Sequence, residues 1–264
     1  MDFTSSLTAS AYLETLALPN EAPRINSLLD TPVETSAAIA EDQAALGAVV
    51  KDSVISYVKD LPPALRQAVM DSTLAAQLDA DARFPDQQKD ARQWYDRYMT
   101  TLAVSGFGTV SSRYQTYSPR STEVELNSVV LEIIEAAAGP NKAALLSLAG
   151  NALEALKGDT QALNKMESKK HDSTVGGFQI MPALYAENGN AIVMLACMQI
   201  HRKESSGGFW FVKWKRSDVT IYRAADAVEL NAEHYDMRAK GLIQDFLYAS
   251  AGDYLSKLKM PENL

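Results

Sequence analysis

The sequence predicts a single α/β domain in which helices cover both faces of a mostly antiparallel sheet. Apolar residues recur at helical spacing through most of residues 1–160, at strand spacing through 174–224, and at helical spacing again through 232–260. The predicted strands are apolar on both faces, so each face needs a cover of helices. The 264 residues contain no internal repeat or evident linker, and 47% of them are hydrophobic, which is enough for one large core.

Three helices are expected before residue 109. Valines and alanines at roughly helical spacing predict the first over residues 32–59, with Pro62-Pro63 ending it. The second is expected over residues 64–83. The third would have Asp86 as its N-cap and would end at residues 106–108, where two glycines flank Phe107. The following segment, residues 109–120, is rich in Ser and Tyr and predicts a loop or an edge strand.

The clearest amphipathic pattern predicts a pair of helices joined at Gly139-Pro140-Asn141. Such a hairpin either covers one face of the sheet or leaves the protein and enters a bilayer interface. Its polar face has few lysines, among them Lys142 and Lys157, so its attraction to anionic lipid would be weak. The residues that would contact a membrane are Leu126, Val130, Ile134, Leu145 and Leu148.

A change to strand periodicity after Thr174 predicts a β-hairpin of residues 175–186 and 191–202, with the Asn188-Gly189 pair of a type I′ turn between them. This turn places Cys197 opposite Ile180. One face would then hold Phe178, Ile180, Leu184, Val193, Leu195 and Cys197, and the other would hold Met181, Tyr185, Ile192, Met194, Met198 and Ile200.

Two more strands and a terminal helix complete the expected elements. The aromatic run at residues 209–214 predicts a third strand, and a fourth is expected at 219–223. A helix should run from Tyr235 to about Leu258, because apolar residues recur through it at helical spacing.

Charge and termini restrict the partners and the location of the protein. Acidic residues outnumber basic ones, 33 to 25, for a net charge of −8, which argues against nucleic-acid binding. The first residues have no secretory signal pattern, and no apolar stretch is long enough to span a membrane. We expect synthesis in the cytoplasm without a signal peptide. Later release or export, followed by association with a host membrane, stays open.

Cys197 is the only cysteine, so neither an internal disulfide nor a recognisable zinc site is expected, and no metal is predicted. Its thiol is an inert buried group, a nucleophile of a hydrolase or acyltransferase, or an attachment point for a lipid. The sequence contains no serine-hydrolase, phosphate-loop, metalloprotease or dinucleotide motif. His201 would lie about 13 Å from Cys197 along the same strand, too far to act as its base. A conventional enzyme is therefore not expected.

The apolar surroundings of Cys197 suggest a cavity for a lipid chain. Its predicted lining is Phe178, Ile180, Leu184, Val193, Leu195 and Trp214. Burying a sixteen-carbon chain would contribute on the order of 10 kcal/mol at about 0.8 kcal/mol per methylene, although one chain alone anchors a protein reversibly.

The lone Cys197 in the apolar run of residues 193–198, followed by a helical C-terminal region, resembles the Erwinia virulence factor Evf. This resemblance implies a non-enzymatic factor that promotes bacterial persistence in the insect gut and is palmitoylated on a cysteine, here Cys197. The amphipathic helix pair followed by hairpin strands is also similar to the Cyt-type cytolysins, which act on membranes. Here Gly207-Gly208 and the charged residues 213–216 interrupt the strands that would insert, which argues against a pore.

From the sequence we therefore predict a virulence or toxin-like factor that associates with a lipid membrane through palmitate or a similar acyl chain in a thioester on Cys197. A Cyt-like membrane-perturbing toxin is the first alternative. A hydrolase or acyltransferase that uses Cys197 is the second.

Overall fold

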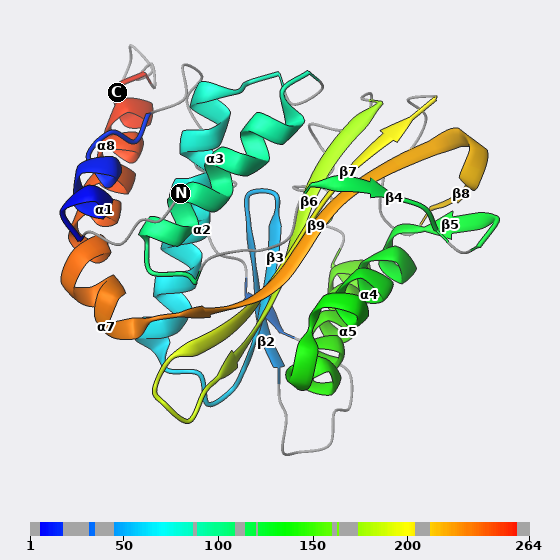
Figure 1. The fold of residues 1–264 in the computed structure, drawn as a ribbon, viewed down its shortest axis with the longest axis horizontal. Helices are drawn as coiled ribbons and strands as arrows, with labels where there is room; N and C mark the ends of the chain where they lie inside the picture. Colours follow the sequence, from blue (N-terminus) through cyan, green and yellow to red (C-terminus); the bar gives the residue numbers. More distant parts are fainter. Residues whose placement is uncertain are drawn as a thin grey trace, which may run out of the picture.

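The computed structural model describes residues 6–17, 32–34, 45–86, 89–108, 114–119, 121–159, 163, 174–203 and 212–257. Over these residues the chain forms an α/β domain with a mostly antiparallel sheet between two layers of helices (Figure 1). The predicted fold class is confirmed.

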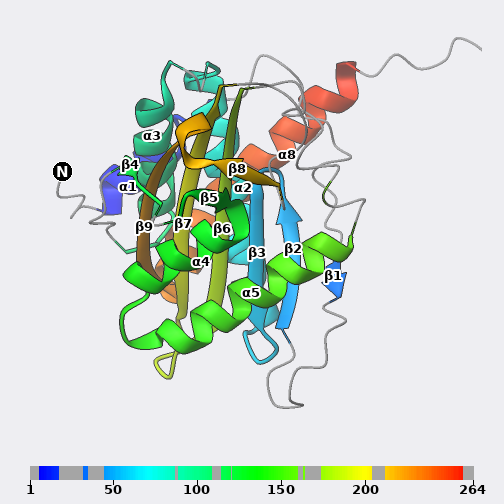
Figure 2. The ribbon, with the colours of Figure 1, turned by 90° about the vertical axis from the view of Figure 1, so that its right-hand side faces the viewer.

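Seven strands form the main sheet, and two short strands form a second one (Figure 2). All neighbouring strands of the main sheet are antiparallel except β3 and β6, which are parallel. The main sheet has the order β1 (Pro32–Glu34), β2 (Ala45–Val50), β3 (Ser53–Val58), β6 (Val175–Tyr185), β7 (Ala191–Arg202), β9 (Val219–Leu230) and β4 (Gln115–Tyr117). The small sheet pairs β5 (Glu123–Glu125) with β8 (Lys213–Lys215).

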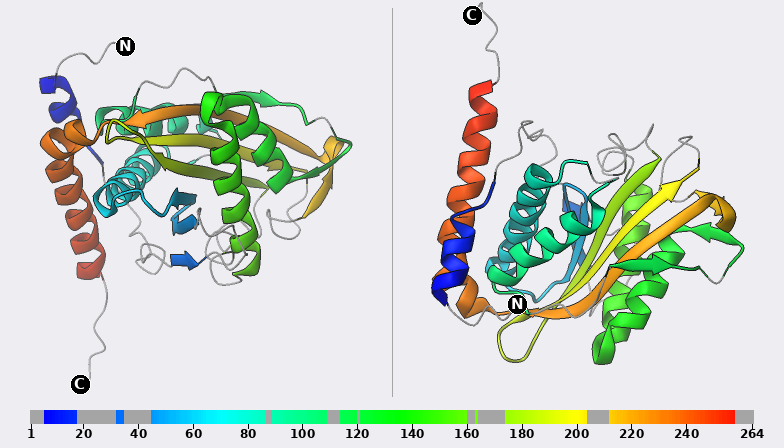
Figure 3. Two further views of the ribbon diagram at one scale, coloured as in Figure 1. Left: turned by 90° about the horizontal axis from the view of Figure 1, so that it is seen from below. Right: turned by 45° about the horizontal axis from the view of Figure 1, so that its top comes forward.

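The two helical layers bury two separate apolar clusters against the sheet (Figure 3). One layer contains α1 (Ser6–Leu13), α2 (Pro63–Arg83), α3 (Ala91–Val104), α7 (Ala232–His234), the π-helix η4 (Tyr235–Ala239) and α8 (Lys240–Lys257). The other contains α4 (Leu126–Ala137) and α5 (Lys142–Gly158), joined by the 3-10 turn η2 (Gly139–Asn141). A further 3-10 turn, η3 (Arg216–Asp218), joins β8 to β9.

The predicted helix over residues 32–59 is wrong, because its described parts are the strands β1, β2 and β3. Val50, Val54 and Val58 recur every four residues. This spacing is close to one helical turn, but it is also a multiple of two, so residues of one strand at this spacing share a face. Lys51 has a φ of +53° and forms the tight turn between β2 and β3. The β-branched residues on both sides of that turn favour a hairpin. Residues 35–44 lie outside the described part of the chain.

The other predicted helices are confirmed, with one change at a helix start. The helix expected over residues 64–83 is α2, and the one expected from Tyr235 is η4 followed by α8. The helix containing Trp94, Tyr95 and Tyr98 is α3, but its N-cap position is occupied by Asp90 and not by Asp86. Residues 109–113 are not described, and β4 follows them as an edge strand.

The α4–α5 hairpin covers the sheet, as one of the two predictions for it stated. The five residues expected to contact a membrane are all in the core: Leu126, Val130, Ile134 and Leu145 are 0% exposed and Leu148 is 4% exposed. Contact with a bilayer would require the hairpin to leave the sheet, and it stays a prediction.

The β6–β7 hairpin is confirmed, but its turn contains three residues and not two. The Ala186 N–H donates to the Asn190 carbonyl (2.9 Å), and the Gly189 N–H donates to the Ala186 carbonyl (3.0 Å). Gly189 has a φ of +86°, the left-handed conformation that ends such a three-residue loop. The Asn-Gly pair therefore occupies the second and third loop positions.

This longer turn shifts the register by one residue, so Cys197 lies opposite Gln179, and Ile180 lies opposite Ala196. A shift of one residue moves every side chain of one strand to the other face. The two predicted faces of β7 are correct, whereas those of β6 are exchanged. Cys197 shares its face with Met181, Val193 and Leu195, while Phe178, Ile180 and Leu184 face α4 and α5 together with Met194, Met198 and Ile200.

The remaining strand predictions differ in extent. Residues 209–211 of the predicted third strand are not described, and Lys213–Lys215 forms β8 in the small sheet. The strand expected at residues 219–223 is the start of β9, which pairs along its whole length with β7 and continues to Leu230.

Candidate functional site

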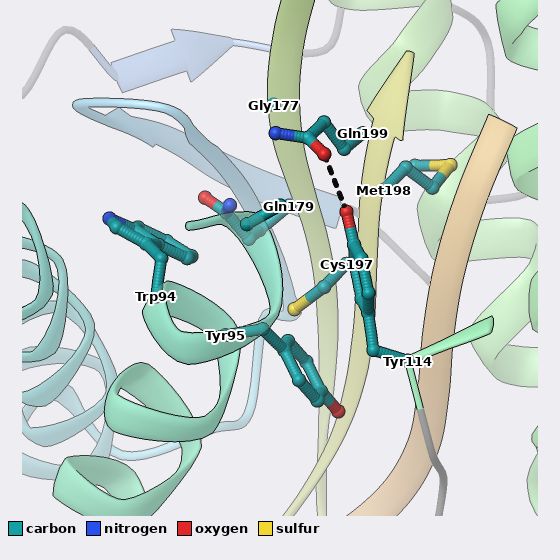
Figure 4. A pocket seen from close by; sticks show the side chains of 9 residues that line it. Trp94, Tyr95, Tyr114, Gly177, Gln179, Cys197, Met198 and Gln199 are labelled. Carbon is teal, nitrogen blue, oxygen red and sulfur yellow. Dashed lines mark hydrogen bonds between the residues drawn. The ribbon is translucent and has the colours of Figure 1, made fainter. Parts of the chain in front are cut away.

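Cys197 lies at the base of a small cavity between β7 and helix α3. Its side chain points away from α4 and α5, toward the aromatic residues of α3 (Figure 4). The cavity is lined by Ala91, Trp94, Tyr95, Tyr114, Gly177, Gln179, Cys197, Met198 and Gln199. Strands β6 and β7 supply its floor, helix α3 supplies one wall, and the residue just before β4 supplies another.

Aromatic side chains fix the two walls of the cavity. Trp94 stacks on Tyr98 with 5.2 Å between ring centroids, and its Nε1 donates to an oxygen of Asp81 at 2.7 Å. Tyr95 stacks on Tyr114 with 5.4 Å between centroids. Since stacked rings and hydrogen-bonded ring nitrogens hold a defined geometry, these walls are preformed.

Tyr114 is the wall on the solvent side. Its hydroxyl donates to Gln199 Oε1 at 2.9 Å, and its ring stacks on Tyr222 at 5.8 Å as well as on Tyr95 (Figure 4). The Tyr114 side chain is only partly buried. One hydrogen bond and two ring contacts therefore hold this wall in place.

Gln179 provides a polar group directly beside the thiol. Its Oε1 accepts a hydrogen bond from the Ser53 hydroxyl at 3.1 Å, and that hydroxyl accepts one from Gln77 Nε2 at 2.9 Å. Gln179 is 3% exposed and lines the cavity, yet its Nε2 has no hydrogen-bond partner among the residues that the structure describes. Cross-strand neighbours such as Gln179 and Cys197 have Cβ atoms about 5 Å apart. The side chains of Gln179 and Cys197 therefore line the same cavity.

The cavity is small in its present form. About 20 Å³ is open to the centre of a water molecule, which is enough for about one water. An acyl chain does not fit without movement of a wall.

Burial suppresses the nucleophilicity of the thiol. Cys197 is 3% exposed, and removal from water raises its pKa to about 12, because the charged thiolate loses its hydration. Among the residues that the structure describes, the lining of the cavity includes no histidine, lysine or acidic residue. Reactive cysteines lie in electropositive, partly exposed settings, whereas Cys197 is buried among aromatic and amide side chains.

The two histidines that the structure describes each contact a group other than Cys197. His201 lies on the same face of β7, as predicted, but its Nε2 is hydrogen-bonded to Gln199 Oε1 at 3.0 Å and burial lowers its pKa. The Nε2 of His234 lies 3.3 Å from the Val104 carbonyl oxygen, and His171 lies outside the described residues.

A second, larger depression lies next to the cavity. It has a volume of about 330 Å³ and is lined by Lys89, Ala91, Arg92, Tyr114, Gln115, Thr116, Gln199, His201 and Tyr222. Ala91, Tyr114 and Gln199 line both spaces. Most residues of the depression are polar or charged, in contrast to the aromatic cavity.

The predicted lipid cavity is not assembled as expected. Val193 and Leu195 are on the same face as Cys197, but Phe178, Ile180 and Leu184 face α4 and α5 because of the register shift. Trp214, on β8, also packs against the α4–α5 cluster. The aromatic lining comes from α3 and Tyr114, which the sequence did not connect with Cys197.

The residues missed by sequence reasoning had one recognisable signal. Gln179 and Gln199 are polar residues within strands that are otherwise buried and apolar, and both point to the same face as Cys197. A buried amide in a core strand needs partners and therefore marks a polar site. The contribution of Tyr114 had no signal, because it depends on the pairing of β4 with the distant strand β9.

Two further expectations concern metals and membranes. Within the described ranges, no group of three or more His, Cys, Asp or Glu side chains has a geometry that could hold a metal ion. Among the helices that the structure describes, none is long and apolar enough to cross a membrane.

Comparisons with known proteins gave similarity in structure only. No family model matches the sequence, and no curated protein matches it. The fold is similar to the structure of the Evf virulence factor, with a TM-score of 0.36 and 13% identity over 76% of this chain and 82% of that one. It is also similar to a delta-endotoxin, with a TM-score of 0.41 and 11% identity over 68% of this chain and 80% of that one. These are the two kinds of protein that the sequence resembles.

Proposed function

We propose that this protein is a non-enzymatic, virulence or toxin-like factor that associates with a host membrane through an acyl chain, such as palmitate, in a thioester on Cys197. The observation that carries the proposal is the position of the thiol, at the base of an aromatic cavity that the amide of Gln179 also lines. An unmodified cysteine in a closely packed core would need neither feature.

The amide of Gln179 suits a thioester better than a free thiol. A thioester adds a carbonyl oxygen next to the Cys197 sulfur, and that oxygen accepts hydrogen bonds. Gln179 Nε2 is a donor that has no partner among the described residues and faces the same cavity. A donor that gains an acceptor forms a hydrogen bond worth about 0.5–1.5 kcal/mol, so acylation would stabilise the site.

The covalent step is an acyl transfer from a thioester donor. The Cys197 sulfur attacks the carbonyl carbon of the donor, a new sulfur–carbon bond forms, and the bond from that carbon to the donor sulfur breaks. The donor leaves as a thiol that takes up the proton lost by Cys197. Because burial causes the high pKa, admission of water to the opened cavity would restore a more acidic thiol for this step.

The small size of the cavity supports the proposed membrane role. A chain attached to Cys197 exceeds the 20 Å³ available and must displace a wall or extend from the protein. An extended chain of sixteen carbons inserts into a bilayer with a free energy of about 0.8 kcal/mol per methylene. One chain gives reversible attachment, so we expect the protein to exchange between water and membrane.

The test is the intact mass of the protein purified from its native source, before and after treatment with hydroxylamine, which cleaves thioesters. We expect an excess mass equal to one acyl group that maps to Cys197 and disappears on treatment. The variant Cys197→Ser should lack this excess and leave the membrane fraction. An unmodified mass, or an equal membrane fraction for Cys197→Ser, would contradict the proposal.

A further inference from the structure

The cavity and the neighbouring depression share three lining residues, Ala91, Tyr114 and Gln199. Tyr114 is the largest of the three, and its side chain lies beside Cys197 (Figure 4). The hydrogen bond to Gln199 Oε1 (2.9 Å) and the contacts with Tyr95 and Tyr222 hold the ring in place. A change in the rotamer of Tyr114 would break these contacts without moving a strand, and it would join the two spaces.

The two spaces have complementary chemistry. The cavity has aromatic walls and the amide of Gln179, whereas the depression presents Lys89, Arg92, Gln115 and Thr116. Lys89 Nζ lies 3.1 Å from Asp86 Oδ2, and Arg92 Nε lies 3.9 Å from Asp96 Oδ2. Each of the two cations therefore has an exposed acidic neighbour. His201 faces the same depression, and burial lowers its pKa. Both long cationic side chains are mostly exposed and free to turn toward a bound anion.

We infer that Tyr114 is a gate, and that the joined space binds an anionic amphiphile whose apolar chain reaches Cys197 while its charged head stays in the depression beside Lys89 and Arg92. The inference rests on the proposed function for its ligand class, since an acyl donor has this form. Opening of the gate would join the space of about 20 Å³ around the thiol to the neighbouring 330 Å³, and the chain and its head would share the joined space.

The gate is tested by the rate at which Cys197 reacts with N-ethylmaleimide. The protein is first treated with hydroxylamine so that the thiol is free. We expect Tyr114→Ala to react at least tenfold faster than the wild type, because the wall is removed. Tyr114→Phe, which loses only the hydrogen bond to Gln199, should react a few-fold faster. Tyr185→Ala truncates an exposed tyrosine on the far end of β6 and should leave the rate unchanged.

Equal rates for Tyr114→Ala and the wild type would overturn the gate, and would leave the mass test of acylation unaffected. Faster reaction of Tyr185→Ala to the same extent would also overturn it, because general loosening of the fold would then explain both. Circular dichroism confirms that each variant is folded before its rate is compared.

The ligand class is tested by protection of the same thiol in Tyr114→Phe. Palmitate, added below the concentration at which it forms micelles, should slow alkylation at least fivefold. Hexadecanol has a similar chain without the charge and should protect more weakly. The double variant Lys89→Ala/Arg92→Ala should weaken protection by palmitate and leave protection by hexadecanol unchanged.

Two results would overturn the ligand assignment. Absence of protection by either compound would show that no chain enters the joined space. Equal protection by both, insensitive to Lys89 and Arg92, would show that the depression does not bind an anionic head. Either result can occur with an acylated Cys197 in the native protein, so the inference and the proposed function fail separately.

Discussion

The two faces of the central sheet are packed in different ways. The face toward α4 and α5 is filled mainly by aliphatic side chains, and the large residues Ile133, Ile134 and Leu145 are fully buried there. The face toward α2 and α3 also has an apolar cluster, but it includes a network of buried amides and hydroxyls and a cavity at Cys197. One face is closely packed, while the other contains buried polar groups and a small cavity.

The largest expected difference between the two faces is in the free energy of unfolding that is lost when a buried side chain is replaced by alanine. Ile134→Ala removes a fully buried side chain from the α4–α5 face and should lower the free energy of unfolding by about 2–5 kcal/mol. Cys197→Ala removes one atom beside an existing cavity and should cost about 1 kcal/mol or less. Urea unfolding of both variants measures the difference. Similar losses for the two would show that the cavity face is packed as closely as the other.

A smaller effect is expected from the polar network. Gln179→Met keeps the shape of the side chain but removes the acceptor for the Ser53 hydroxyl, which should cost about 1–3 kcal/mol. As a control, Met194→Leu on the α4–α5 face conserves volume and should cost less than about 1.5 kcal/mol. If Gln179→Met leaves the free energy of unfolding in urea unchanged, the polar network does not contribute to a difference in stability between the two faces.

The smallest effect is the dependence of stability on pH. The thiol of the unfolded chain ionises near pH 8.5, whereas the folded protein keeps its proton up to a pKa of about 12. Between these values the folded state binds more protons, so stability is full below about pH 8.5 and falls as pH rises.

This loss amounts to about 1.4 kcal/mol per pH unit for a single thiol. We expect the wild type with a free thiol to lose that much more stability than Cys197→Ala between pH 9 and 10, measured by urea unfolding at each pH. Parallel pH profiles of the two proteins would show that the thiol is not desolvated.

Helical spacing of apolar residues made several helices predictable: α2, α3, the α4–α5 pair and the C-terminal helix. The fold class was predictable from these helices together with the apolar strands. The β2–β3 hairpin was not, since Val50, Val54 and Val58 fit both a helix and a strand. The register of β6 and β7 depends on whether the Asn-Gly pair forms a two-residue or a three-residue loop, and both loops accept this pair.

The candidate site was predictable only in part. Cys197 and its buried setting came from the sequence, but the residues around it belong to α3, β6 and the segment before β4. Their meeting depends on contacts between distant parts of the chain. The one-residue register shift then moved Phe178, Ile180 and Leu184 to the opposite face.

The parallel pairing of β3 with β6 has a consequence for the order of folding. Its hydrogen-bonded partners Ser53 and Gln179 are 126 residues apart, and the helices α2 to α5 lie between them in the chain. During synthesis, the β2–β3 hairpin emerges with an open edge that stays unpaired until β6 leaves the ribosome. Late closure of such a long loop slows folding, and the open edge exposes the nascent chain to aggregation. Chaperone binding to ribosome-bound chains should therefore decline once the β6–β7 hairpin has emerged.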